Sequence, residues 1–224
     1  MHVLLFDIDG TLLRSGGAGK LALETAFREV FGLQELVGDV PYSGRTDRAI
    51  CLDLLRAHGL AETQENWMRL RDAYLGQLPL ALTRVTGNVM PGIAELLIWL
   101  RGQSGYCLGL LTGNIREGAR IKLGHYNLFH YFPFGGFGDL HFCRNEVARE
   151  ARALVREHVP HDVTDDRVWV IGDTPLDVRC ARAIGAKAVA VATGGFTRQQ
   201  LAVESPDLLF DDLSDPGPLL KCLS

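Results

Sequence analysis

A run of apolar residues that ends in two closely spaced carboxylates places the strongest constraint on this chain. Residues 3–6 are apolar, Asp7 and Asp9 follow one residue apart, and Gly10 and Thr11 come next. A short apolar run closed by a glycine turn predicts a buried strand that leads into a loop. The carboxyl ends of parallel strands form the ligand crevice of open α/β sheets. We therefore expect the two carboxylates to lie at such a crevice.

The close spacing of Asp7 and Asp9 favours a bound cation, which carboxylates and a substrate phosphate could hold together. Two ionised carboxylates this close raise each other's pKa unless a positive charge neutralises them. Proteins usually hold Mg²⁺ with one or two carboxylates and the oxygens of a substrate phosphate. One carboxylate can then attack while the other transfers a proton. An Asp- and Gly-rich surface turn is the alternative for the pair alone, and the strand ends further along the chain argue against it.

Two later apolar runs end in the same way. Residues 106–111 lead into Thr112, Gly113 and Asn114, where the hydroxyl and the backbone amides are candidate phosphate donors at the start of a helix. Residues 168–171 lead into a segment with two further carboxylates four residues apart, Asp173 and Asp177. Carboxylates at the ends of two apolar strands indicate a shared site rather than two unrelated helix caps.

Composition limits the class of protein. The chain has 224 residues, 47% of them apolar, and a net charge of −4, which provides no basic field for nucleic acid. No apolar run approaches the roughly 20 residues of a membrane span, and a strand with an acidic loop stands where a signal peptide would begin. The five cysteines are scattered without a CxxC pair, so we expect no zinc site, no disulfide framework and a cytoplasmic location.

The order of elements predicts an α/β protein with a helical insertion. Strands and helices alternate from residue 86 onward, with later strands at 187–192 and 207–210, which predicts a doubly wound parallel sheet. No strand pattern appears between Leu13 and Val85. Helical spacing there predicts helices over 20–31, 46–58 and 62–83, with Thr46 as an N-cap and Pro79 bending or interrupting the third.

The segment Asp7-Ile8-Asp9-Gly10-Thr11-Leu12 resembles the first motif of the haloacid dehalogenase-like hydrolases. The segment at Thr112 is similar to the second motif of that superfamily and the segment at Asp173 to the fourth, so the resemblance covers nearly the whole chain. It implies a Rossmann-like core of residues 1–14 and 86–224, and a helical cap domain of residues 15–85 that closes over the active site.

The resemblance also implies a mechanism. Most members are Mg²⁺-dependent phosphatases that act through an aspartyl-phosphate. Asp7 would be the nucleophile and Asp9 the acid and base, and Mg²⁺ would be held by Asp7, the backbone carbonyl of Asp9 and Asp173. Thr112, with the amides of Gly113 and Asn114, would bind the phosphate.

The third motif of the superfamily is a basic residue, most often lysine, which screens the nucleophile and holds the phosphate. No lysine occurs between Lys122 and Lys187, and Arg144, at the start of a predicted helix, is the candidate for this position. Arginine keeps the charge but not the shape of lysine. An exposed residue at a helix start is the alternative. Asp177 would orient the groups around the metal, with Arg144 as its expected partner.

Substrate choice is expected to lie in the cap domain. Arg45, just before the predicted helix at Thr46, can pair with a second anionic group because its fork matches carboxylate and phosphate; a solvated arginine is the alternative. The layout resembles phosphoglycolate phosphatases, and sugar phosphates and nucleotides remain open as small phosphomonoester substrates. The sequence does not encode the oligomeric state.

Four other functions are alternatives to a phosphatase. A dehalogenase needs neither a metal nor an acid, which the three residues Asp9, Asp173 and Asp177 argue against. A phosphonatase needs an imine-forming lysine in the cap, where only Lys20 is available. A β-phosphoglucomutase-like enzyme keeps all four motifs and stays open. A non-catalytic binding module is disfavoured by the intact acid and base pair.

Overall fold

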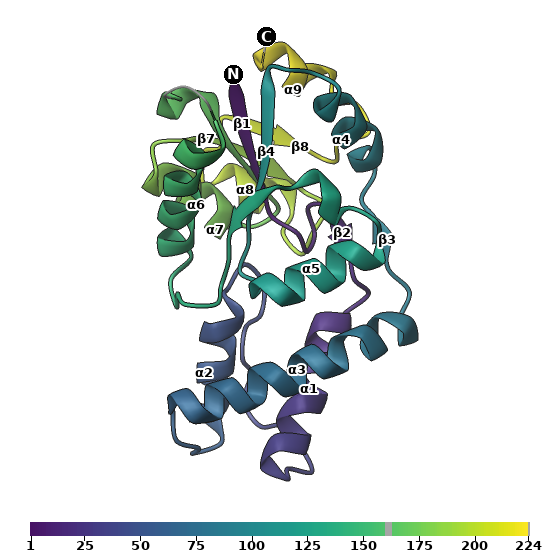
Figure 1. Cartoon of the computed structure of the whole chain (residues 1–224), viewed down its shortest axis with the longest axis vertical. Helices are drawn as coiled ribbons and strands as arrows, with labels where there is room; N and C mark the ends of the chain where they lie inside the picture. The colour runs from purple at the N-terminus through teal and green to yellow at the C-terminus, as the bar shows by residue number, and fades with distance from the viewer. Residues whose placement is uncertain (160–162, 224) are drawn as a thin grey trace.

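The computed structural model describes residues 1–159 and 163–223, and its centre is a parallel β-sheet (Figure 1). Within these residues the sheet has six strands in the order β5-β4-β1-β6-β7-β8. The strands are β1 (His2–Phe6), β4 (Tyr106–Leu111), β5 (Phe134–Gly136), β6 (Val168–Gly172), β7 (Lys187–Val191) and β8 (Leu208–Phe210). The expected doubly wound α/β fold is confirmed, with β1 at the centre.

The alternation of side chains along β1 divides the helices between the two faces of the sheet. Leu4 and Phe6 point into one apolar core, which α4 (Ile93–Arg101), α5 (Arg116–His125) and α9 (Gly217–Cys222) cover. Val3 and Leu5 point into the opposite core. This second core is covered by three further helices: α6 (Arg144–His158), α7 (Pro175–Ala183) and α8 (Arg198–Ala202). Because β1 is buried on both faces, its whole apolar run is explained.

Three helices that lie in the sequence between β1 and β4 form a third apolar core. They are α1 (Ala18–Phe31), α2 (Asp47–Ala57) and α3 (Gln64–Arg84), and Figure 1 shows them together beyond the lower end of the sheet. Thr46 caps α2 as expected, since its hydroxyl accepts the amide of Ala49. Helix α5 carries Ile115 into this core, so it lies between the sheet and the three helices.

Two features of the chain connections differ from the expectations. Helix α3 continues through Pro79 to Arg84, because its inner face stays packed while Pro79 lies on the exposed side. Leu13–Arg14 (β2) and Asn88–Val89 (β3) pair as an antiparallel ribbon where the chain leaves and re-enters the sheet region. Strands of two residues have no periodicity that a sequence pattern can detect.

Short 3₁₀ turns complete the described chain at Phe129–Tyr131 (η1) and Asp165–Arg167 (η2). None of the helices in residues 1–159 and 163–223 combines the length and the apolar character that a membrane crossing needs.

Candidate active site

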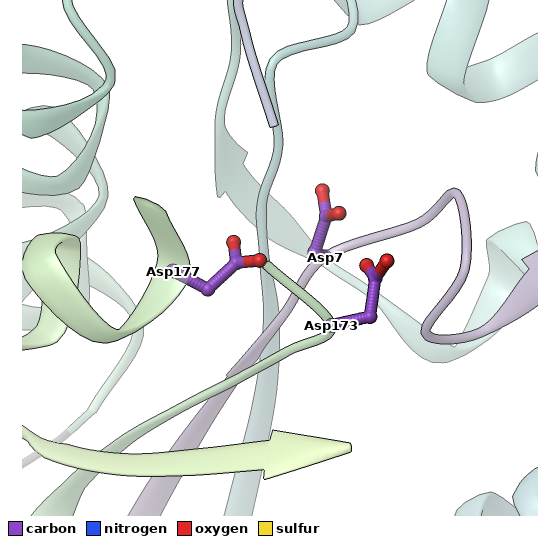
Figure 2. A group of neighbouring side chains, drawn as sticks. All are labelled: Asp7, Asp173 and Asp177. Atoms are coloured by element: carbon purple, nitrogen blue, oxygen red, sulfur yellow. The ribbon is translucent and has the colours of Figure 1, made fainter. Parts of the chain in front are cut away.

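Carboxylates from adjacent strands meet at the carboxyl edge of the sheet. Asp7 follows β1, Asp173 follows β6, and Asp177 lies one helical turn into α7 (Figure 2). A carboxylate oxygen from each of the three lies within 4.8 Å of one from the other two, and all three residues are buried. The register of β1 beside β6 causes this convergence, because Phe6 pairs with Ile171 and the two strands end together.

Asp173 sits in a cradle of backbone that excludes side chains. A Cβ atom at Gly194 would lie 1.6 Å from Asp173 Oδ2, and one at Gly10 would lie 2.4 Å from the same oxygen. Gly10 also has a φ of 89°, which favours glycine. Thr11 Oγ1 donates to Asp173 Oδ1 at 3.1 Å. Gly10, within the first motif, therefore serves both the turn and the close approach of this carboxylate.

Arg144 joins the two other carboxylates at the start of α6. Its Nη2 lies 2.8 Å from Asp7 Oδ1 and 2.5 Å from Asp177 Oδ1, and the side chain is 5% exposed. Asp177 Oδ2 accepts from the amide and the hydroxyl of Thr174, at 2.9 and 2.7 Å, in a capping box. The expected contact between Arg144 and Asp177 is present, and the alternative of an exposed helix-start residue is wrong.

The charges at this edge do not balance. Burial, together with the charges of Asp177 and Asp9, raises the pKa of Asp7 to about 6 although Arg144 opposes the rise. Burial and the charges of Asp177 and Asp7 likewise raise the pKa of Asp173. Three carboxylates facing one guanidinium leave two negative charges. A divalent cation with oxygen ligands, such as Mg²⁺, fits both this charge and the donor set.

Asp9 faces a different cation. Its Oδ2 accepts from Lys122 Nζ at 2.6 Å and from Asn114 Nδ2 at 3.0 Å, and its Oδ1 accepts from Ser15 Oγ at 3.2 Å. Burial acts to raise the pKa of Asp9, but the charge of Lys122 and these hydrogen bonds hold it below its usual value. The Asp9 side chain is 40% exposed, so it still opens onto the site.

Lys122 was not among the predicted site residues. A signal existed, because Lys122 lies three residues after Ala119 and seven after Ile115, on the inward apolar face of the predicted helix. A charged residue on such a face is unusual unless it has a partner. The partner lies more than a hundred residues away along the chain, and helical spacing alone does not identify it.

The predicted phosphate loop lies beside Asp9. Thr112 is fully buried, and its Oγ1 accepts from the backbone amide of Asn114 at 3.3 Å and from Asn114 Nδ2 at 2.9 Å. A Cβ at Gly113 would lie 2.0 Å from the carbonyl oxygen of Arg45, so the chain before α2 rests directly on this loop. The structure thus brings Thr112, Gly113 and Asn114 to the carboxylate edge, and Arg144, the fourth predicted phosphate-binding residue, reaches it from α6.

The cap segment, defined as residues 15–85, docks on the loop through Asp47. The Asp47 amide donates to the Gly113 carbonyl at 2.8 Å, and Asp47 Oδ2 accepts from the Ile115 amide at 2.9 Å. Ile115 stands at the N-cap position of α5 and its own side chain makes no capping hydrogen bond. Burial raises the pKa of Asp47 to about 6 against the opposing charge of Lys122. The amide of this N-cap residue is therefore satisfied by the cap segment, while the amide of Arg116, the first residue of α5, donates to Asp139 Oδ2 at 2.7 Å.

A cavity of about 260 Å³ lies between the sheet edge and the cap segment. Asp7, Asp9, Asp173 and Arg144 line it from one side, and the cap side contributes apolar, aromatic and basic residues that include Leu23, Trp67, Arg45 and Arg71. Arg45 Nη1 lies 2.7 Å from Asp53 Oδ2, so the predicted substrate residue lines the cavity while paired with a carboxylate.

Comparison with known proteins places these features in a family. The sequence model of the haloacid dehalogenase-like hydrolase family matches residues 4–182 of this chain. A phosphoglycolate phosphatase of Synechococcus elongatus is 30% identical over 215 residues, 96% of this chain and 95% of that protein. One of Aquifex aeolicus is 28% identical over 229 residues, 100% of this chain and 97% of that protein.

A solved structure shares the fold over the same extent. CbbY from Rhodobacter sphaeroides, crystallised in complex with phosphate, aligns with a TM-score of 0.76 and 20% identity over 97% of each chain. The matches extend across the sheet and the helical insertion alike. The resemblance of the motifs is confirmed, and the chain belongs to the haloacid dehalogenase-like hydrolases, as a phosphatase of that family.

Proposed function

We propose that this phosphatase hydrolyses a small phosphomonoester with Mg²⁺, through an aspartyl-phosphate on Asp7. The observation that carries the proposal is the convergence of Asp7, Asp173 and Arg144 with Asp9 on one cavity. Residues 1–14 and 86–224 form the catalytic core in this proposal, and residues 15–85 form its cap domain.

Asp7 is the nucleophile. Arg144 holds one of its oxygens at 2.8 Å, which leaves the other oxygen for attack on phosphorus. Asp7, Asp173 and the backbone carbonyl of Asp9 would hold Mg²⁺, which supplies neutralising charge for the phosphoryl oxygens when bound. In this proposal Thr112 and the amides of Gly113 and Asn114 would bind the remaining oxygens. Catalysis of this kind depends mainly on positioning and charge.

Asp9 transfers protons. In the first step it protonates the leaving oxygen, and in the second it takes a proton from the water that attacks the phosphorylated Asp7. The lowered pKa of Asp9 suits the second step, because the group is ionised at neutral pH. The negative charge of an arriving phosphate raises the pKa of a neighbouring carboxyl, which is the direction that the first step requires.

Phosphoglycolate is the first substrate to test. Two relatives that align over nearly their whole length are phosphoglycolate phosphatases, and Arg45 lines the cap side of the cavity. A substrate carboxylate there would either share the Arg45 guanidinium with Asp53 or take the place of Asp53 beside it. The apolar wall formed by Leu23 and Trp67 makes larger sugar phosphates and nucleotides the next members of the panel.

The test is hydrolysis of p-nitrophenyl phosphate and of the panel, with Mg²⁺ and with a chelator. Asp7→Asn should lose nearly all turnover, and Asp211→Asn, at a side chain that is 82% exposed, should keep it. Rapid quenching of the wild type should trap a phosphorylated protein that Asp7→Asn lacks. Undiminished Mg²⁺-dependent activity of Asp7→Asn would end the proposal. Release of inorganic phosphate without an added sugar bisphosphate separates hydrolysis from phosphoryl transfer between sugars.

A further inference from the structure

Lys122 is a buried lysine to which the proposed chemistry gives no role. It lies on α5 with a side chain only 5% exposed, next to the fully buried Leu123. An ammonium group in such a place is unfavourable unless it is paired and hydrogen-bonded. Its partners are therefore the reason for its place in the fold.

Those partners are two residues of the site. Lys122 Nζ lies 2.6 Å from Asp9 Oδ2 and 2.6 Å from Asn114 Oδ1, and Asn114 Nδ2 in turn donates to Asp9 Oδ2 at 3.0 Å. The three side chains close a ring of hydrogen bonds, in which the ammonium and the carboxamide both donate to the same oxygen of Asp9, Oδ2. Networks of this kind rigidify their members when every group is satisfied.

The ammonium also determines which way the Asn114 amide faces. A lysine has donors only, so the atom of Asn114 that meets it must be the oxygen. The Nδ2 group is then directed at Asp9 and Thr112, and both accept from it. Without Lys122 the Asn114 oxygen loses this donor, and with it one of the contacts that fix the amide beside Asp9.

The cap segment covers this ring at a glycine. A Cβ at Gly19, in the first turn of α1, would lie 3.0 Å from Lys122 Nζ and 3.3 Å from its Cε. Tyr74 of α3 is 4% exposed, and its hydroxyl lies 4.0 Å from the same Cβ position. Asp47 is a further carboxylate near the ammonium. The helices of the cap segment thus pack tightly over Lys122 at a residue that has no side chain.

We propose that Lys122 is a positioning residue that holds the Asp9 carboxylate, through Asn114 and its own ammonium, in the orientation needed for proton transfer to the leaving oxygen. The inference rests on the proposed function, since it takes Asp9 as the acid and base. Asp9 keeps 40% of its side chain exposed, so a fixed carboxylate still reaches substrate.

The leaving group provides the test. An alkyl phosphate needs a proton on its leaving oxygen, whereas p-nitrophenolate leaves without one. Lys122→Met should lower kcat/KM for the best alkyl phosphate of the panel by about 100-fold, a typical loss when general acid catalysis fails, and for p-nitrophenyl phosphate by less than about 5-fold. The matched control is Lys187→Met, which removes a lysine 3.1 Å from Asp207 at the other end of the strands, and we expect it to leave both values unchanged.

A second variant tests the same contact in case Lys122→Met loses activity by unfolding. Gly19→Ala adds a better helix former, so its thermal midpoint should stay level or rise, while the new Cβ displaces Nζ. We expect the ratio of the alkyl to the aryl kcat/KM to fall several-fold. Equal losses with both esters in Lys122→Met, or an unchanged ratio in either variant, would overturn the inference. Asp7→Asn in the same assay tests the proposed function separately, because it should abolish both activities whatever Lys122 does.

Discussion

Withdrawal of magnesium should make the stability of this protein depend on pH, and Asp7 is one of the carboxyl groups that cause this dependence. Burial raises the pKa of Asp7 from its ordinary 3.8 to about 6 in the folded protein. Because the folded pKa is the higher one, the folded state binds the extra proton, and the stability it provides is complete below a pH of about 4. That stability is lost as the pH rises through about 6. A shift of about two units corresponds to about 3 kcal/mol.

Urea unfolding in chelator and in Mg²⁺, at a pH of about 5 and of about 8, measures this loss. A bound cation favours ionised carboxylates, so Mg²⁺ should return the lost stability, about 3 kcal/mol, at the higher pH and little at the lower. Asp7→Asn should weaken the pH dependence in chelator but not abolish it, because the pKa values of Asp173 and Asp47 are raised as well, and Asp211→Asn should leave it as in the wild type. Equal stabilisation by Mg²⁺ at both pH values would refute the charge imbalance from which we infer a divalent cation.

Three substitutions test other parts of the site. Arg144→Met leaves two buried carboxylates without their shared guanidinium, and we expect urea unfolding to show a loss of about 3–5 kcal/mol; a loss below about 1 kcal/mol would contradict the buried pairing. Gly194→Ala places a Cβ 1.6 Å from Asp173 Oδ2, and calorimetric titration should show Mg²⁺ binding weakened by about 10–100-fold, whereas unchanged affinity would separate Asp173 from the metal. Asp47→Ala removes the acceptor of the Ile115 amide, and thermal unfolding should report a loss of about 1 kcal/mol, with a neutral effect arguing that water replaces the carboxylate.

Much of the fold and part of the site could be predicted because the relevant signals are local. The apolar runs that end in Asp7 and Asp173 identify neighbouring strands, since parallel strands end at one edge. Arg144 was predicted from its place at a helix start, and the buried ion pairs with two carboxylates show why an arginine fits there. The Nη2 group of Arg144 contacts both carboxylates and the Leu111 carbonyl, and Nη1 donates to the Gly44 carbonyl.

The remainder depends on contacts between distant segments. Lys122 looks like one polar residue of an amphipathic helix until Asp9 is placed beside it. The continuity of α3 through Pro79 depends on packing that outweighs the lost backbone hydrogen bond. Arg45 was predicted to meet an anionic group, and the structure gives it Asp53, so its role toward substrate stays a prediction.

The hydrogen bond between Asp47 of the cap segment and the start of α5 affects when Asp9 is held in place during turnover. The amide of Ile115, the N-cap residue of α5, is bonded to Asp47 of the cap segment, and the same helix carries Lys122, which is bonded to Asp9. The amide of Arg116, the first helical residue, is bonded to Asp139, outside the cap segment. If the cap segment moves away to admit substrate, the start of α5 therefore loses the bond to Asp47 and keeps the bond to Asp139. We expect Asp9 to be held most firmly when the cap segment lies over the site, with Asp47 near the ammonium of Lys122.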